Sequence, residues 1–141
     1  MRDVKCQERI VKKCDIRVKF DSDAVRNAVR KGGVKSLRQA GAYVRKAARH
    51  AVKKSPRASN AGTPPHTRRG LLKRSLLFGV EPRRMAVVIG PAYQFVGISM
   101  TAHEFGGMYR RRKYPKRALM GPTLQKAAPN ISKMWADSVK S

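Results

Sequence analysis

The sequence predicts an α+β domain, in which a long N-terminal helix and a C-terminal helix pack on a small, mostly antiparallel sheet. The chain has 141 residues, a length that suits one compact domain. Apolar residues recur at helical spacing from Val34 to Lys54 and again after Pro122, and two short apolar runs joined by a turn lie between them. These observations place two helices around a hairpin.

Residues 1–20 are expected to form an N-terminal arm, ahead of a single domain at residues 21–141. Within the arm, Ile16 to Phe20 alternates apolar and basic residues, which is the period of a half-buried strand. A first helix is expected to begin near Ala24, because the preceding residues offer oxygen-bearing side chains that suit a helix N-cap: Asp21, Ser22 and Asp23.

Two helical segments are expected before the hairpin. In the first, Val25 and Val29 lie one turn apart on the expected buried face, and Gly32-Gly33 is expected to interrupt it. The second runs from Val34 to Lys54, with one narrow stripe of apolar and small residues and basic residues on its other faces. The stripe is expected to be core and comprises Val34, Leu37, Gly41, Val44, Ala48, Ala51 and Val52.

The middle of the chain predicts loops and strands. The proline-containing residues 55–67 are expected to form an exposed loop. Ser75 to Val80 and Met85 to Ile89 are expected to pair as a hairpin, and the unbroken apolar run from Val87 to Ile89 predicts a strand covered on both faces. Residues 92–105 fit either a strand or a short helix, and residues 107–117 are expected to form a second exposed loop.

A closing helix is expected near the C-terminus, with Pro122 in its first turn. Its apolar stripe continues to Val139 and includes Met134 and Trp135. These two residues are expected to be core, although a terminal helix is also a common contact in an assembling protein. Pro129 lacks an amide donor and clashes with the preceding turn, so it is expected to kink or split the helix.

The charge of the chain is extreme, with 33 lysines and arginines against 8 acids and a formal net charge of +25. Self-repulsion of that size destabilises a compact state, so an anionic partner is expected. A membrane is the least favoured partner, because no stretch approaches the roughly 20 apolar residues of a spanning helix. Without a recognisable secretion signal, the chain is expected to be made in the cytoplasm, with Cys6 and Cys14 reduced.

No enzyme, cofactor or metal site is predicted. His50 and His66 have no carboxylate or cysteine nearby in a ligand pattern, and the His103-Glu104 pair lacks the second histidine of the zinc-protease motif, because Gly107 stands there. Acids are also too scarce in the body of the chain for a paired-carboxylate mechanism or for a metal-dependent nuclease.

A cluster of basic residues surrounds Tyr109 and Tyr114. Such a loop suits contact with phosphates, with the tyrosines stacking on bases. It equally suits pairing of its arginines with an acidic protein neighbour, and both interpretations stay open at this stage. The candidate contact residues are Arg110, Arg111, Arg112, Lys113, Lys116 and Arg117.

Five segments occur in a recognisable order. A basic, alanine-rich helix runs into a proline-containing loop, and four motifs follow: Thr67 to Leu76, Val88 to Pro91, Ala102 to Gly107 and Tyr114 to Leu124. In this order and spacing they resemble the small neck and tail-completion proteins of tailed phages. The resemblance spans roughly Val34 to Val139 and does not cover the first twenty residues. Ala118 and Leu119 stand where those proteins usually have proline and phenylalanine.

The resemblance implies a minor structural protein of the virion that joins the DNA-filled head to the tail. It implies a ring or collar of copies that contacts the head-closure or connector ring and the tail-terminator ring. Copies in a ring touch through two different patches. A basic lumen or rim would then hold packaged double-stranded DNA or dock onto acidic connector surfaces.

The motif residues are expected to form the fold rather than to catalyse. In particular, Phe105 is expected to be buried ahead of a turn in which Gly106 takes a positive φ. The fold-forming set comprises Gly70, Leu71, Ser75, His103, Glu104, Phe105, Gly106, Pro115 and Pro122.

The alternative function is that of a small basic nucleic-acid-binding protein of the ribosomal or nucleoid type. The net charge motivates it, and it predicts binding that weakens steeply as salt rises. No recognised nucleic-acid-binding module is visible in the sequence to support it.

Overall fold

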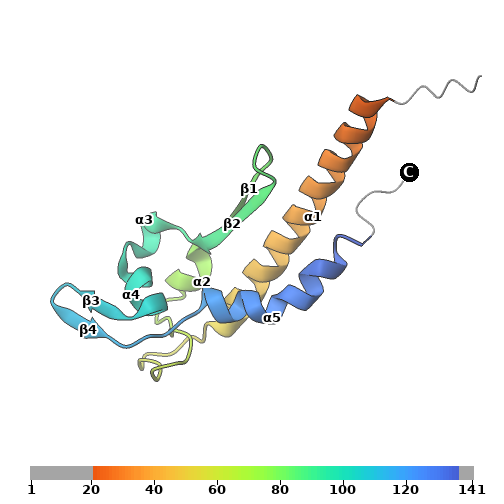
Figure 1. Cartoon of the computed structure of the whole chain (residues 1–141). Helices are drawn as coiled ribbons and strands as arrows, with labels where there is room; N and C mark the ends of the chain where they lie inside the picture. The colour runs from red at the N-terminus through yellow and green to blue at the C-terminus, as the bar shows by residue number, and fades with distance from the viewer. Residues whose placement is uncertain (1–20, 137–141) are drawn as a thin grey trace, which may run out of the picture.

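The computed structural model describes residues 21–136 and has the expected α+β architecture (Figure 1). A β-hairpin and the last helix pack on a long first helix, and short helices and a second hairpin lie at one end of it. The strand expected at Ile16 to Phe20 falls outside the described residues. The elements are α1 (Ser22–Ala51), α2 (Leu71–Ser75), β1 (Leu76–Glu81), β2 (Ala86–Pro91), α3 (Tyr93–Val96), α4 (Ser99–Phe105), β3 (Gly107–Tyr109), β4 (Arg112–Tyr114) and α5 (Met120–Lys133).

Helix α1 is one continuous helix of 30 residues. The Asp21 side chain caps it by accepting hydrogen bonds from the amides of Asp23 and Ala24, at 3.1 and 2.9 Å. The interruption expected at the glycine pair was wrong, since the helix continues through it. Gly33 is buried where a Cβ would collide with Met85 Cε, so close packing of the hairpin offsets the roughly 1 kcal/mol that a helical glycine costs.

The first turns of α1 project beyond the rest of the fold (Figure 1). Every residue from Ser22 to Lys31 is exposed. Val25 and Val29, which were expected to be buried, are 46% and 48% exposed. That prediction was wrong because the described C-terminal segment extends along α1 only as far as Ser36, whose hydroxyl donates to the Met134 carbonyl at 3.1 Å.

Strands β1 and β2 pair antiparallel and pack on α1. Gly41 makes this contact close, since a Cβ there would lie 2.6 Å from Phe78 Cδ2 and 2.9 Å from Val87 Cγ2. The expectation that the apolar run of β2 is covered on both faces was wrong, because Val88 is 62% exposed. Helix α1 covers one face of the hairpin, which is the usual arrangement for an antiparallel pair.

The region after β2 resolves the ambiguity left by the sequence, because residues 92–105 hold the short helices α3 and α4. Residues 107–117 were expected to be a loop, but residues 107–114 form the antiparallel hairpin of β3 and β4. Its turn contains Arg110 and Arg111, with φ of 47° and 62°. Hairpin turns with these dihedrals usually contain asparagine or glycine, so the sequence lacks the customary signal.

The core lies where the end of α1 meets α2, β1, α4 and the start of α5. Leu76 and Leu119 are fully buried at its centre. The Ser55–Thr67 loop closes over the end of α1, with the Thr67 amide donating to the Lys53 carbonyl at 2.9 Å. The buried apolar cluster comprises Ala48, Val52, Leu72, Leu76, Met100 and Leu119.

Helix α5 lies along the second half of α1 and runs through Pro129 as one helix of 14 residues (Figure 1). The proline therefore does not split it. Gln125, whose carbonyl loses its amide partner, and Pro129 are both exposed, so the proline lies on the face of the helix away from the core. None of the described helices is long and apolar enough to cross a lipid bilayer.

The substitution Gly41→Leu is expected to lower the free energy of unfolding by about 1–3 kcal/mol, because the new side chain pushes the hairpin off α1. Urea denaturation followed by circular dichroism measures the change. Gly79→Ala is the matched control, since nothing lies within 4 Å of a Cβ at that position. An unchanged midpoint for Gly41→Leu would contradict the close contact between α1 and the hairpin.

Candidate interaction surfaces

The Glu104 carboxylate joins α4 to the start of α5. It accepts hydrogen bonds from the amides of Leu119, Met120 and Gly121, at 2.7, 3.1 and 2.8 Å. These amides belong to the first turn of α5, where no preceding helical carbonyl is available, and a negative charge is favoured there by the helix dipole. Glu104 therefore caps α5 from another element.

Hydrogen bonds from the backbone and from the Arg117 side chain fix the segment between β4 and α5. The Arg117 amide donates to the His103 carbonyl at 2.6 Å, and the Arg117 guanidinium donates from Nε to the Ser59 carbonyl at 2.8 Å. The Gly62 amide donates to the Lys116 carbonyl at 2.8 Å. Arg117 is thus used to hold the Ser55–Thr67 loop, and its side chain is partly buried.

The glycine turn after α4 has the predicted backbone, with a φ of 77° at Gly106. The burial of Phe105 was predicted wrongly, because this side chain is 74% exposed. A Cβ on Gly106 would lie 3.4 Å from the Lys116 amide nitrogen, so the turn brings the two segments close together. The phenylalanine is left free on the surface.

The remaining motif residues divide between the surface and the interior. Gly70 caps α2 with a φ of 75°. Ser75 is buried and donates to the Leu72 carbonyl at 2.9 Å. Three others are exposed: Leu71, Pro115 and, in the first turn of α5, Pro122.

His103 supports the β3–β4 hairpin through aromatic contacts. Its ring meets Tyr114 edge-on with 5.3 Å between centroids, and Tyr114 meets Tyr109 at 6.0 Å. Burial, followed by the positive charge of Arg117, lowers the pKa of His103 from its ordinary value. Its Nδ1 is buried without a hydrogen-bond partner in the described part of the chain. Within residues 21–136 no three His, Cys, Asp or Glu side chains gather into a metal-binding group.

The tip of the β3–β4 hairpin is a cationic surface. Arg110 to Lys113 are exposed there, and Lys116 is exposed at the base of the hairpin, beside Gly106. The Arg110 guanidinium lies 5.5 Å from the centroid of the Tyr109 ring. The ion pairs found among the described residues are elsewhere, between Arg26 and Asp23 and between Arg84 and Glu81. Five of the six candidate contact residues are therefore available to an anionic partner, and Arg117 serves the fold.

A second cationic surface lies between α1 and α2. It is a shallow hollow of about 320 Å³. The sequence did not single it out, because it forms only where the basic face of α1 passes beside the lysine of α2. Its lining residues are Arg45, Lys46, Arg49, His50 and Lys73.

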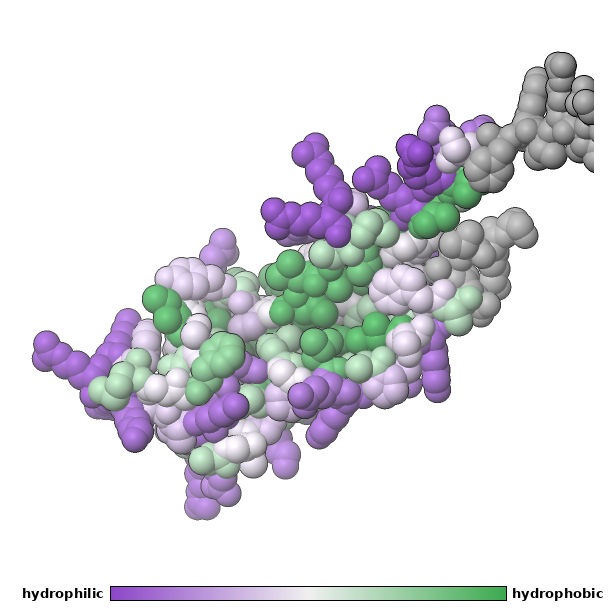
Figure 2. Space-filling model, in the orientation of Figure 1, coloured by the Kyte–Doolittle hydropathy of each residue, from purple (hydrophilic) through white to green (hydrophobic). Residues whose placement is uncertain are grey.

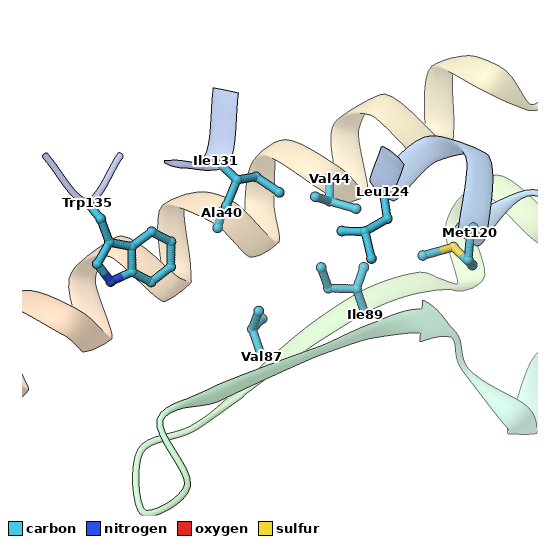
Figure 3. Close-up of a pocket in the computed structure, with 9 residues that line it drawn as sticks. Ala40, Val44, Val87, Ile89, Met120, Leu124, Ile131 and Trp135 are labelled. Atoms are coloured by element: carbon cyan, nitrogen blue, oxygen red, sulfur yellow. The ribbon is translucent and has the colours of Figure 1, made fainter. Parts of the chain in front are cut away.

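An apolar groove of about 370 Å³ lies between α1, β2 and α5 (Figure 3). Figure 2 shows it as a contiguous apolar region on the face toward the viewer. Trp135, which was expected to be core, stands at one end of the groove and is partly exposed, and Leu124 is half-exposed. The groove escaped prediction because its lining comes from three separate elements: Ala40, Val44, Val87, Ile89, Met120, Gly121, Leu124, Ile131 and Trp135.

The substitution Glu104→Gln is expected to lower the free energy of unfolding by about 1–3 kcal/mol, because a neutral amide accepts from the α5 amides more weakly and turns one donor toward them. Thermal unfolding measures the change. Glu81→Gln removes an exposed ion pair and should cost under about 1 kcal/mol. Equal losses for the two variants would contradict the capping role.

His103 is expected to make stability depend on pH. Its folded-state pKa is depressed, so at and below pH of about 6.5 the unfolded chain binds the proton more readily. Stability is full above that pH and is lost as pH falls toward the folded-state pKa. Urea denaturation between about pH 7.5 and 5.5 should show a steeper loss for the wild type than for His103→Gln. A slope for His103→Gln equal to that of the wild type would contradict this role of His103.

The chain was compared with known proteins at three levels. No protein-family model, no curated protein and no solved structure matches it. The surfaces of the chain that bear on its function are the cationic hairpin tip and the apolar groove.

Proposed function

We propose that this chain is a non-enzymatic structural subunit of the neck of a tailed phage, where a ring or collar of copies helps to join the DNA-filled head to the tail. Its partners are other copies of itself and the rings of the head connector and tail terminator. Packaged double-stranded DNA is the further partner that its charge suits.

The observation that carries this proposal is the amount of apolar surface that the fold leaves uncovered. Every described helix and strand except β4 carries at least one exposed large hydrophobic side chain. Single exposed residues are normal, but a contiguous apolar groove between three elements is typical of a surface that another chain covers. A subunit of an assembly has this character.

The distribution of charge supports the same proposal. The cationic hairpin tip lies at the opposite end of the molecule from the free start of α1 (Figure 1). A ring that presented these tips toward its axis or its rim would concentrate positive charge in one place. Such a surface suits DNA phosphates or the acidic face of a neighbouring ring.

The positions of the motif residues add support. Glu104 caps α5, Gly106 turns the chain after α4, and the Arg117 side chain holds the Ser55–Thr67 loop. These contacts use three of the motif residues for architecture and leave the apolar and cationic surfaces for partners. This use agrees with what the resemblance to neck and tail-completion proteins implies.

The second candidate function, binding of nucleic acid as a small basic protein, is favoured by one observation. The β3–β4 hairpin combines exposed arginines with tyrosine rings, a combination that suits phosphate contact and base stacking. This candidate requires no ring and no partner proteins. It also leaves the apolar groove without a use.

Disruption of this gene in the parent phage is expected to yield DNA-filled heads lying apart from full-length tails. The physical reason is that a missing ring removes the surface on which the two meet. Negative-stain microscopy of the particles measures the outcome, and supply of the wild-type chain from a plasmid should restore joined virions.

Joined virions in the disrupted phage would overturn the neck proposal. The isolated chain would then be tested for DNA binding over a range of salt. A slope of log K against log salt of about −0.9 for each phosphate contacted would support the second candidate. Weak binding at low salt would remove that candidate as well.

A further inference from the structure

We propose that the free first turns of α1, Ser22 to Lys31, pack into the apolar groove of a second copy of this chain in a head-to-tail contact. This inference rests on the proposed function and deepens it, because a ring or collar needs a contact between two different patches. In this contact the groove of one copy is filled by the projecting helix of the next copy.

The projecting part of α1 is a helix without tertiary support in the described part of the chain. Its ten residues span about 15 Å and all are exposed. These turns continue a helix that is already nucleated, but they lack the packing of an apolar face from which most helical stability in proteins comes. A helix that projects in this way is stabilised when another surface covers it.

The projecting helix is amphipathic. Val25, Ala28 and Val29 are spaced three and four residues apart and share one face. Arg26 and Arg30 lie on the opposite side, 100° and 140° around the helix from Val25 when each residue turns by about 100°. Two valines and an alanine make a narrow apolar ridge of the kind that docks into a groove.

The face of α1 that bears Val25 and Val29 is covered by α5 further along the helix. Val25 and Val29 align with Ser36, where α1 receives α5, and Ala40 follows one turn later in the groove itself. The groove exposes the α5 side chain of Leu124 at its surface. A projecting helix seated there would meet in the next copy the element that covers α1 in its own chain.

Charge favours the groove as a place of contact between copies. Copies with a net charge of +25 repel one another, so association is least costly where positive charge is absent. No residue that lines the groove is charged. Asp21 and Asp23 stand at the start of α1, where they partly offset the positive charge of the projecting turns. The projecting turns themselves carry Arg26, Arg30 and Lys31 against Asp23, but these cations lie about 100° or more around the helix from Val25, so the apolar ridge can enter the groove without burying them.

Sedimentation of the purified full-length chain tests the contact. The mass of the wild type should rise above the 15.8 kDa of one chain as concentration increases toward about 1 mM. Val29→Glu on the helix and Leu124→Glu in the groove should each hold the mass at that of one chain. Each blocking substitution has a matched control that adds a glutamate at a neighbouring position. Asn27→Glu lies on the opposite face of α1 and Gln125→Glu lies outside the groove. Both control variants should associate as the wild type does.

A mixture of the two blocked variants provides the sharpest measurement. Val29→Glu keeps an intact groove and Leu124→Glu keeps an intact helix, so an equimolar mixture has one working contact. It should form a dimer and nothing larger. Circular dichroism should show unchanged helix content, because both positions are exposed in the single chain.

Three outcomes would overturn the proposal. A wild type that stays at 15.8 kDa means that another occupant, such as a segment of the same chain or a different protein, covers the groove. Association that survives both blocking substitutions means that copies meet elsewhere. A mixture that gives no dimer excludes a head-to-tail contact. Since this experiment uses only the isolated chain, its result is independent of whether the disrupted phage yields separated heads and tails.

Discussion

The capping of α5 by Glu104 is the contact on which the arrangement of this fold depends. One carboxylate accepts hydrogen bonds from three amides at the start of α5 and so fixes where that helix begins relative to α4. From that point α5 follows α1, and Asn130 reaches Tyr43 through a hydrogen bond of 2.7 Å. The position of α5 in turn sets one wall of the apolar groove. The capping contact therefore links the core to the surface that we assign to a second copy.

The sequence was informative where the pattern is local. The stripe of α1 and the two strands of the first hairpin follow from periodicities that a short window contains, and both were predicted within a few residues. The glycine pair in α1 led to a wrong prediction of a helix break. Gly33 is required by its close contact with Met85, which is distant in sequence. The hairpin of β3 and β4 was missed because its turn contains two arginines instead of asparagine or glycine. Local rules fail where a distant contact or a functional demand determines the residue.

The candidate surfaces were predictable in the same uneven way. A run of basic residues around two tyrosines is visible in the sequence, and the structure leaves most of that run exposed. It also shows that Arg117 is engaged with Ser59, which no spacing rule indicates. The groove and the projecting start of α1 depend on where α5 ends against α1, and a pattern within one helix cannot supply that length. Val25 and Val29 were assigned correctly to an apolar face but wrongly to the interior of their own chain.

At the turn of the β3–β4 hairpin, positive charge is present at the expense of local stability. Arg110 and Arg111 both adopt a left-handed backbone, which costs an arginine roughly 1–2 kcal/mol and costs glycine almost nothing. Selection for thermal stability alone would place asparagine and glycine at these two positions. The hairpin tip instead holds two consecutive arginines in an unfavourable backbone conformation. Local stability and charge density compete directly at this turn, so a variant improved for one property loses the other.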